Sequence, residues 1–241
     1  MKDKSRYSRN IGILKESDQD LLSKKSVCVI GCGGLGGGVI ENLTRLGVGE
    51  LTVVDSDVFD MTNLNRQVLS NEENIGKSKA AEAASQMKLI NSEADITPIQ
   101  TEITEENCRQ IIAGHDLVID AVDNIKTRFI LEEACEKEGI TLIHGAIGGW
   151  SGQVGVARPE DKLISKIYAA DMNDNAADTD AVLEDKAAVD TLSGNPSFTA
   201  SVVSAIQAAE AIKVLLGKED ALYNKLLMID LSEHSYEVIE L

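Results

Sequence analysis

The stretch "VCVIGCGGLGGGVI", Val27–Ile40, is an apolar run that ends in a cluster of glycines. Its first half is typical of a buried strand, and the residues after the glycines predict a helix. Gly31, Gly33 and Gly36 form the spacing G-x-G-x-x-G between the two, and Asp55 ends the next predicted strand. In such a turn the backbone can approach a phosphate, the helix N-terminus supplies N–H donors, and the carboxylate can accept hydrogen bonds from ribose hydroxyls. The stretch therefore predicts a nucleotide site rather than a purely structural turn, and leaves both a dinucleotide and ATP open.

The rest of the chain alternates predicted strands with predicted helices. This alternation indicates an α/β fold, a doubly wound, mostly parallel sheet with helices on both faces, up to about residue 158. A long helix follows over 197–217, which we expect to be buried because apolar residues lie nearly all round it, and two short strands close the chain within 226–241. The other expected strands are 27–30, 50–57, 94–103, 116–124, 140–146 and 152–158, and the other expected helices are 6–24, 36–46, 78–90, 106–115 and 126–139.

This pattern predicts a single domain over residues 1–241. We divide it into a nucleotide-binding half over 1–158, a crossover loop over 159–195, and a C-terminal helix with strands over 196–241. Residues 168–190 are rich in Ala, Asp and Asn and poor in large apolar residues. We interpret them as a mobile crossover segment or lid, with an ordinary disordered loop as the alternative.

The composition narrows the class of protein. A length of 241 residues with 43% hydrophobic residues suffices for one large α/β domain. The net charge of −17 repels nucleic-acid phosphates and anionic lipid, and no local basic patch opposes it. The first ten residues lack the apolar segment of a signal peptide, and no run reaches the roughly 20 apolar residues of a membrane span. We expect a cytoplasmic protein that binds neither nucleic acid nor a membrane.

The cysteines and histidines offer no recognisable metal site. No Cys-x-x-Cys pair occurs, so we expect the cysteines to be small buried residues rather than zinc ligands or disulfide partners. The histidines lie far apart in the sequence, and each is more typical of a packed or surface residue than of a ligand. The residues concerned are Cys28, Cys32, Cys108, Cys135, His115, His144 and His234.

Two cations after Asp55 favour ATP over a dinucleotide. Arg66 lies in "TNLNRQ" and Lys79 lies in "GKSK", at the start of a predicted helix. Two fixed cations are more than one pyrophosphate needs, whereas a triphosphate must have its β and γ groups neutralised as they leave. Each could be a solvated surface charge, but together with the glycine turn they indicate an ATP site.

Asp123 and Asn124 are placed at the end of the predicted strand 116–124. Open α/β sheets bind their ligands at the carboxyl ends of the strands, and a carboxylate there can hold the Mg²⁺ that bridges phosphates. Asp120 is the competing carboxylate, although it lies inside the predicted strand. The alternative role for Asp123 and Asn124 is to cap the helix that follows.

Several motifs together resemble one family. "RYSRN", "GCGGLGG", "VVDSDVFDMTNLNRQVL", "GKSKA", "DAVDN", "GQVGV" and "SAIQAAEAIKVLLG" occur in the order found in the ThiF/MoeB/HesA family of adenylyltransferases, which resemble ubiquitin-activating enzymes. The resemblance covers the chain from Arg6 onward. It implies a homodimer that uses ATP and Mg²⁺ to adenylate a C-terminal carboxylate, usually the Gly-Gly end of a small ubiquitin-like sulfur carrier.

The resemblance also implies roles for individual residues. Arg9 of "RYSRN" would reach into the ATP site of the neighbouring subunit, and Asp123 would hold Mg²⁺. Arg66 and Lys79 would act in catalysis together with Arg9 and Asp123. In the reaction, a carboxylate attacks the α-phosphorus and pyrophosphate leaves. No general base is needed, because a carboxylate is already deprotonated at pH 7. The residues expected to bind ATP are Gly31, Gly33, Gly34, Gly36, Asp55, Asn63, Asn65, Arg66, Lys79, Asp123 and Asn124.

The chain departs from many relatives in two places. It has neither of the two Cys-x-x-Cys pairs that form a zinc site in those relatives, so we expect a variant without zinc. Residues 159–195 also contain no cysteine that could take the activated carrier into a covalent bond. We further expect the strand around "GGWSGQVGVAR" and the acidic crossover to flank a channel for the carrier's tail, with Trp150 either beside it or in the core.

Two other functions remain open from the sequence. One is a tRNA-modifying enzyme that adenylates a threonylcarbamoyl adenosine, which the net charge of −17 and 3% aromatic residues disfavour. The other is a non-catalytic nucleotide-binding scaffold subunit, against which Arg66, Lys79 and Asp123 argue. The sequence does not identify the carrier or the pathway.

Overall fold

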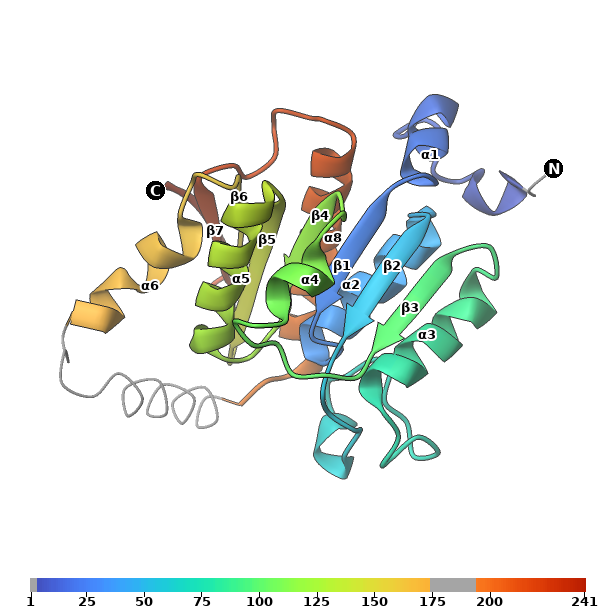
Figure 1. The fold of residues 1–241 in the computed structure, drawn as a ribbon, viewed down its shortest axis with the longest axis horizontal. Helices are drawn as coiled ribbons and strands as arrows, with labels where there is room; N and C mark the ends of the chain where they lie inside the picture. The colour runs from blue at the N-terminus through green and yellow to red at the C-terminus, as the bar shows by residue number, and fades with distance from the viewer. Residues whose placement is uncertain (1–3, 174–193) are drawn as a thin grey trace.

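The structure is a computed structural model that describes residues 4–173 and 194–241 (Figure 1). Its centre is an eight-stranded sheet of order β3-β2-β1-β4-β5-β6-β7-β8. The first five strands in this order are parallel and the last three add on antiparallel. This confirms the predicted doubly wound, mostly parallel α/β fold. The strands are β1 Ser26–Ile30, β2 Glu50–Val54, β3 Asp95–Ile99, β4 Leu117–Asp120, β5 Thr141–Gly148, β6 Ser151–Ala157, β7 Lys225–Asp230 and β8 Ser235–Glu240.

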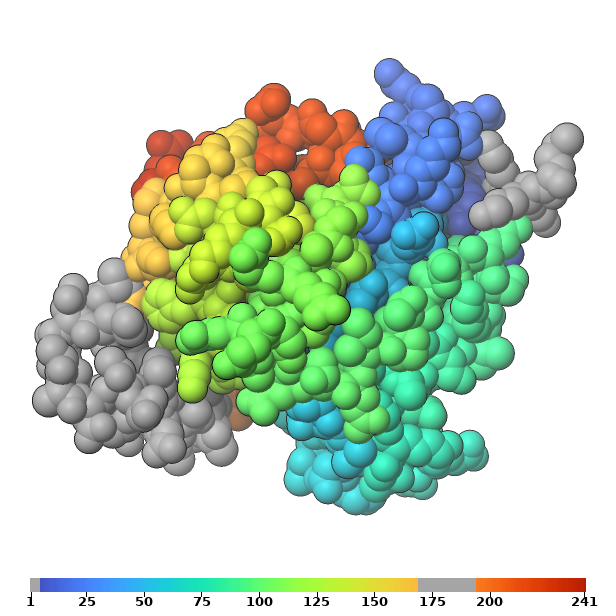
Figure 2. Space-filling model, viewed as in Figure 1, coloured from blue at the N-terminus to red at the C-terminus, as the bar shows by residue number. Residues whose placement is uncertain are grey.

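Helices cover both faces of the sheet. Apolar residues of α2, α3 and α8 pack in one core cluster, and those of α4, α5 and α6 pack in the other. Figure 2 shows the second face, on which α4 and α5 (green to yellow-green) cover the middle of the sheet between the N-terminal segment (blue) and α6 (amber). The helices are η1 Lys4–Tyr7, α1 Glu16–Leu22, α2 Gly34–Leu46, η2 Met61–Asn63, α3 Lys79–Ile90, α4 Cys108–Ile112, α5 Ile125–Glu138, α6 Leu163–Asn173 and α8 Ser197–Leu215.

The apolar helix α8 is a core helix, as expected. Its length and composition would also allow a membrane span, but 56% of its most apolar window is buried inside the protein. Small residues let it approach its neighbours closely: a Cβ on Gly38 of α2 would lie 2.9 Å from the Cβ of Ser204. Val203, Ala208 and Ala211 of α8 are buried in the same cluster as the core of α2. The helix α8 therefore packs directly against α2, the helix that begins at the glycine turn.

Some predicted boundaries are wrong. The strand expected to reach Asn124 stops at Asp120, because the Asp120 carboxylate accepts the N–H of Val122 at 3.1 Å and turns the chain. The expected helix over 6–24 is two short helices, η1 and α1. The helix after the glycines begins at Gly34 rather than at residue 36.

The crossover region begins with a helix that the sequence did not predict. Glu132 of α5 accepts the N–H groups of Ile164 (2.6 Å) and Ser165 and so caps α6, which runs to Asn173. The rest of the predicted mobile segment, residues 174–190, lies outside the described residues. Trp150 is 54% exposed, so of the two places considered for it the core is wrong. It packs against Phe198 with the ring centroids 4.6 Å apart.

All four cysteines are buried, as expected. Burial raises the pKa of the Cys108 thiol to about 11. The pKa values of Cys28 and Cys135 are raised mainly for the same reason. Thiols with raised pKa values stay protonated at neutral pH and pack as small apolar side chains.

Candidate active site

A cleft of about 560 Å³ lies where the parallel strands end. It is lined by the glycine turn, the ends of β2 and β4, the start of α3, and Asn195, which lies two residues before α8. Its volume falls in the range of small-molecule sites, about 300–1,000 Å³. It brings together most of the predicted ATP-binding residues: Gly31, Gly33, Gly34, Asp55, Arg66, Lys79, Asp123 and Asn124.

The four glycines of the turn have two different physical roles. Gly31 has φ +95°, and a Cβ there would lie 2.5 Å from the carbonyl oxygen of Ala121. A Cβ on Gly36 would overlap the carbonyl oxygen of Gly31, so both glycines are needed for α2 to pack on the sheet. A Cβ on Gly33 or Gly34 would meet protein atoms only at 3.5 Å or more. Packing therefore does not require glycine at these two positions, whereas close approach of a ligand to the backbone would.

Asp55 is fixed against the glycine turn. Its Oδ2 accepts the N–H of Cys32 at 2.7 Å, and its Oδ1 accepts the N–H of Asp57 at 2.9 Å. Burial raises the pKa of this carboxyl, opposed by these two N–H donors and by Lys79. Because each carboxylate oxygen can accept a second hydrogen bond, the side chain can also receive ribose hydroxyls.

The two predicted cations reach the cleft from different elements. Lys79 is the first residue of α3, and its buried Nζ lies 3.0 Å from the carboxylate of Asp57, a residue that the sequence analysis did not single out. Arg66 follows η2 and donates to the carbonyl of Thr62 at 3.0 Å and to Asn65 Oδ1 at 2.9 Å. Both side chains can neutralise phosphate oxygens in the cleft.

Of the two candidate carboxylates, Asp120 at the end of β4 and Asp123 after it, only Asp123 lines the cleft. Asp123 is exposed in the loop between β4 and α5, and Asn124 caps α5 by accepting the N–H of Thr127 at 2.9 Å. Asp120 is fully buried and hydrogen-bonded inside the protein. One carboxylate with substrate phosphates is a common way for proteins to hold Mg²⁺, so the donor set fits that ion. Within residues 4–173 and 194–241, no group of three or more His, Cys, Asp or Glu side chains is placed to hold a metal by itself.

Four predicted residues do not line the cleft. Asn63 is buried in the η2 turn, where its Oδ1 accepts the N–H of Asp60 at 3.0 Å. Asn65 is exposed and donates to the carbonyl of Asn195 at 3.3 Å. Gly36 is buried beneath the turn.

Arg9 is the fourth. It is exposed on the N-terminal segment, which lies at the opposite edge of the sheet from the carboxyl ends of the strands (Figure 1). Tyr7 of the same segment packs beside Gly47, the residue that ends α2. Arg9 therefore does not enter the cleft of its own chain.

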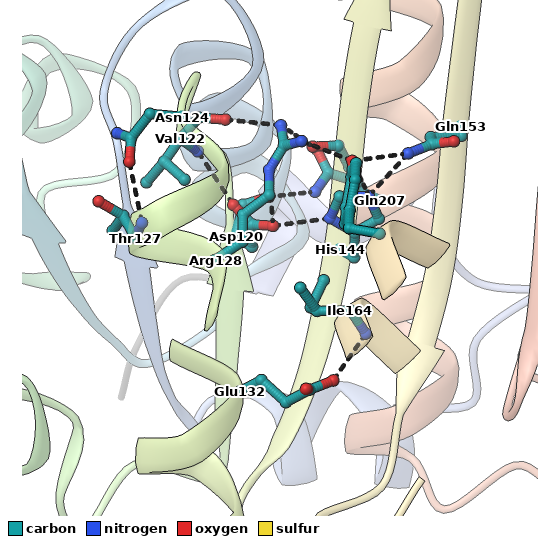
Figure 3. Close-up of polar contacts among 12 residues, drawn as sticks. Asp120, Val122, Asn124, Thr127, Arg128, Glu132, His144, Gln153, Ile164 and Gln207 are labelled. Atoms are coloured by element: carbon teal, nitrogen blue, oxygen red, sulfur yellow. Dashed lines mark hydrogen bonds and ion pairs between the residues drawn. The ribbon is translucent and has the colours of Figure 1, made fainter. Parts of the chain in front are cut away.

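A buried polar network that was not predicted from the sequence lies next to the cleft (Figure 3). Arg128 of α5 donates from Nη2 to the carbonyl of Val122 at 2.9 Å and from Nη1 to the hydroxyl of Tyr168 at 2.6 Å. Its Nε lies 3.5 Å from Asp120 Oδ2. Arg128 thus ties the loop that carries Asp123 to β4 and to α6.

His144 lies at the centre of this network. It is opposite Asp120 in the register of β4 and β5, and its Nδ1 lies 2.7 Å from Asp120 Oδ2. Burial lowers the pKa of His144 despite the carboxylate, so the ring is neutral at pH 7 and its Nδ1–H donates to Asp120. Its Nε2 then accepts from Gln153 Nε2 at 3.1 Å. The available sequence signal was a titratable residue inside each of two neighbouring apolar strands.

Comparisons with known proteins identify the family of this chain. Residues 7–241 match the ThiF family. The SAMP-activating enzyme E1 of Haloferax volcanii is 35% identical over 237 residues, which cover 97% of this chain and 84% of that protein. The sulfur carrier protein adenylyltransferase of Thermus thermophilus is 34% identical over 224 residues, which cover 90% of this chain and 79% of that protein. The adenylyltransferase and sulfurtransferase MOCS3 of Xenopus laevis is 32% identical, and the chain spans about half of it (51%).

Solved structures show the same fold at low sequence identity. The crystal structure of E. coli MccB has a TM-score of 0.81 at 22% identity and covers all of this chain and 70% of that one. The structure of PaaA has a TM-score of 0.78 at 19% identity, covering 99% and 82%. These structures support the fold alone. From the family match over nearly its whole length and the similarity to the curated relatives, the chain belongs to the ThiF family.

Proposed function

We propose that this protein is an adenylyltransferase that uses ATP to activate the C-terminal carboxylate of a small ubiquitin-like sulfur carrier ending in Gly-Gly. One observation carries the proposal: a single cleft gathers the glycine turn, Asp55, two cations and Asp123. Two of the curated relatives are named adenylyltransferases, one of them of a sulfur carrier protein, and a third is named a SAMP-activating enzyme E1.

The positions of the residues in the cleft suggest which part of ATP each of them would contact. Asp55 at the end of β2 would receive the ribose, and the backbone at Gly33 and Gly34 would face the phosphates at the N-terminus of α2. Arg66 and Lys79 would neutralise the β- and γ-phosphates, with Lys79 exchanging its contact with Asp57 for a phosphate. Asp123 would hold Mg²⁺, which adds positive charge where the leaving group gains negative charge.

In the reaction, an oxygen of the carrier's carboxylate attacks the α-phosphorus. The new bond joins that oxygen to the α-phosphorus, and the bond from the α-phosphorus to the oxygen bridging the β-phosphorus breaks. Pyrophosphate leaves with that bonding pair, and no proton has to be removed, because the carboxylate is ionised at neutral pH. The protein's contribution is to position the groups and to stabilise the leaving charge.

The proposal includes a cytoplasmic homodimer without zinc, in which Arg9 serves the partner's cleft. The position of Arg9 outside its own cleft supports an action in trans. The two alternatives are a tRNA-adenylating enzyme, which the net charge of −17 disfavours, and a nucleotide-binding scaffold.

ATP–pyrophosphate exchange tests the proposal. With MgATP and a panel of purified sulfur carriers that end in Gly-Gly, the protein should exchange labelled pyrophosphate into ATP only when a carrier is present. Asp123→Ala should abolish exchange, and Asp220→Ala, which changes an exposed carboxylate outside the cleft, should leave it unchanged. ATP binding without exchange for any carrier would support the scaffold instead.

A further inference from the structure

Two buried amide oxygens in the cleft have no hydrogen-bond partner within residues 4–173 and 194–241. Among the described residues, Oε1 of Gln67 and Oδ1 of Asn195 are inaccessible to solvent and unpaired, and both residues line the cleft. Gln67 is only 6% exposed. A buried acceptor without a donor is costly, and a water, an ion or a ligand that enters the cleft can supply that donor.

Both oxygens lie away from the expected nucleoside end. The amide of Gln67 is beside the glycine turn, where a Cβ on Gly33 would lie 3.5 Å from its Nε2. Asn195 precedes α8 and is held by Asn65, which donates to its carbonyl at 3.3 Å. Asp55, in contrast, follows β2. In the sheet, β1 separates β2 from β4 and β5.

The chemistry of the two atoms decides what they can bind. Ionised phosphate oxygens are acceptors only and cannot pair with an amide oxygen. The donors of the nucleoside are its ribose hydroxyls and adenine amine, which would lie toward Asp55. The remaining ligand in an adenylation cleft is the acyl substrate, and the donors of an extended peptide are its backbone N–H groups.

We propose that Gln67 and Asn195 accept hydrogen bonds from the peptide N–H groups of the last two residues of the carrier. This inference rests on the proposed function, because it assigns the substrate's tail within the same cleft. The Asn195 acceptor is fixed in advance: the carbonyl of the adjacent Gly194 receives the N–H of Gly149 at 2.8 Å, and Thr199 bonds the same hairpin at 2.8 Å. The two contacts would hold the terminal carboxylate toward the α-phosphorus.

Removing single N–H donors from the carrier tests this assignment. Semisynthetic carriers would have N-methylglycine in place of the last or the penultimate glycine, and exchange would be measured with the wild type and Gln67→Met. We expect one methylated carrier to lose roughly tenfold in kcat/KM with the wild type. Gln67→Met should show that loss with the unmodified carrier and no further loss on methylation, while its KM for ATP stays within about twofold of the wild type.

The controls separate this inference from the function on which it rests. Gln110→Met, an exposed glutamine on α4, should keep the full effect of methylation. If Gln67→Met does not fold, Asn195→Ala allows the same comparison of methylated and unmodified carriers for the other glycine N–H. Equal methylation losses in the wild type and both variants would overturn the assignment, whereas no exchange with the unmodified carrier would overturn the proposed function itself.

Discussion

The guanidinium of Arg128 lies 2.9 Å from the carbonyl oxygen of Val122, the residue immediately before Asp123. The same side chain contacts Asp120 of β4 and Tyr168 of α6. A residue outside the predicted set therefore holds the loop that presents the candidate magnesium carboxylate. It also connects that loop to the helix that begins the crossover region.

Replacing Arg128 should destabilise the protein strongly. Arg128→Met leaves Asp120 buried without its cation, which typically costs about 3–5 kcal/mol in the free energy of unfolding. Urea denaturation measures the loss. Arg109→Met is the matched control, since this half-exposed arginine pairs with Glu138 at the surface and should cost less than about 1 kcal/mol. Similar losses in the two variants would show that the buried network contributes little.

Alanine substitutions should distinguish the glycines that packing requires from those that a bound ligand requires. Gly34→Ala should fold normally, because the nearest atom to its Cβ would be the Cβ of Ala200 at 3.7 Å and because alanine favours the helix. The same variant should bind ATP at least tenfold more weakly than the wild type. Gly36→Ala should not fold stably, because its Cβ would overlap the Gly31 carbonyl. Calorimetric Tm and ATP titration give both results. Unchanged ATP affinity in folded Gly34→Ala would place the phosphates elsewhere.

The buried histidine should make stability depend on pH. Burial lowers the folded-state pKa of His144 below the ordinary value of 6.5, so the unfolded chain takes up the proton first as the pH falls. The contribution of the neutral ring is complete above about pH 6.5 and decreases below it. His144→Asn, which keeps an N–H donor for Asp120, should flatten the fall in unfolding free energy between about pH 6.5 and 5. The exposed His234→Asn control should keep the wild-type slope, and an equal slope in all three proteins would refute the assignment.

Mixed dimers test whether Arg9 acts in trans. Arg9→Ala and Asp123→Ala should each be inactive alone, whereas a mixed dimer would pair one intact cleft with an intact Arg9 from the other chain. Random pairing makes about half of the dimers mixed, each with one whole site, so activity should return to roughly a quarter of the wild type. No recovery in dimers shown by mass spectrometry to be mixed would reject the trans arrangement.

Much of the fold could be predicted because its signals are local. The apolar runs that form β1, β2 and β5 are bounded by turn residues, and the glycine spacing marks the start of α2 within two residues. The helix α6 could not be predicted, because a distant side chain stabilises its first turn. Glu132 caps α6 from another helix, and no pattern within residues 163–173 announces it.

Some residues of the candidate site could also be predicted from the sequence, whereas others could not. Asp55 and Asp123 could be predicted because the carboxyl ends of parallel strands meet at one edge of the sheet, and Lys79 because it is a cation at the start of a helix. The pairing of Asp120 with His144 could not, because it depends on the register between β4 and β5. Asn63 does not line the cleft, because its side chain closes a local turn, and a motif does not distinguish such a contact from a ligand contact.

The fate of one oxygen atom tests the central claim most directly. A carrier labelled with ¹⁸O in its C-terminal carboxylate would be incubated with the protein, MgATP and hydroxylamine, which cleaves an acyl-adenylate at its carbonyl carbon. If the carboxylate attacks the α-phosphorus, mass spectrometry should find one ¹⁸O in each AMP, and Asp123→Ala should form none. AMP without the label, or no AMP with any carrier ending in Gly-Gly, would contradict adenylation of the tail.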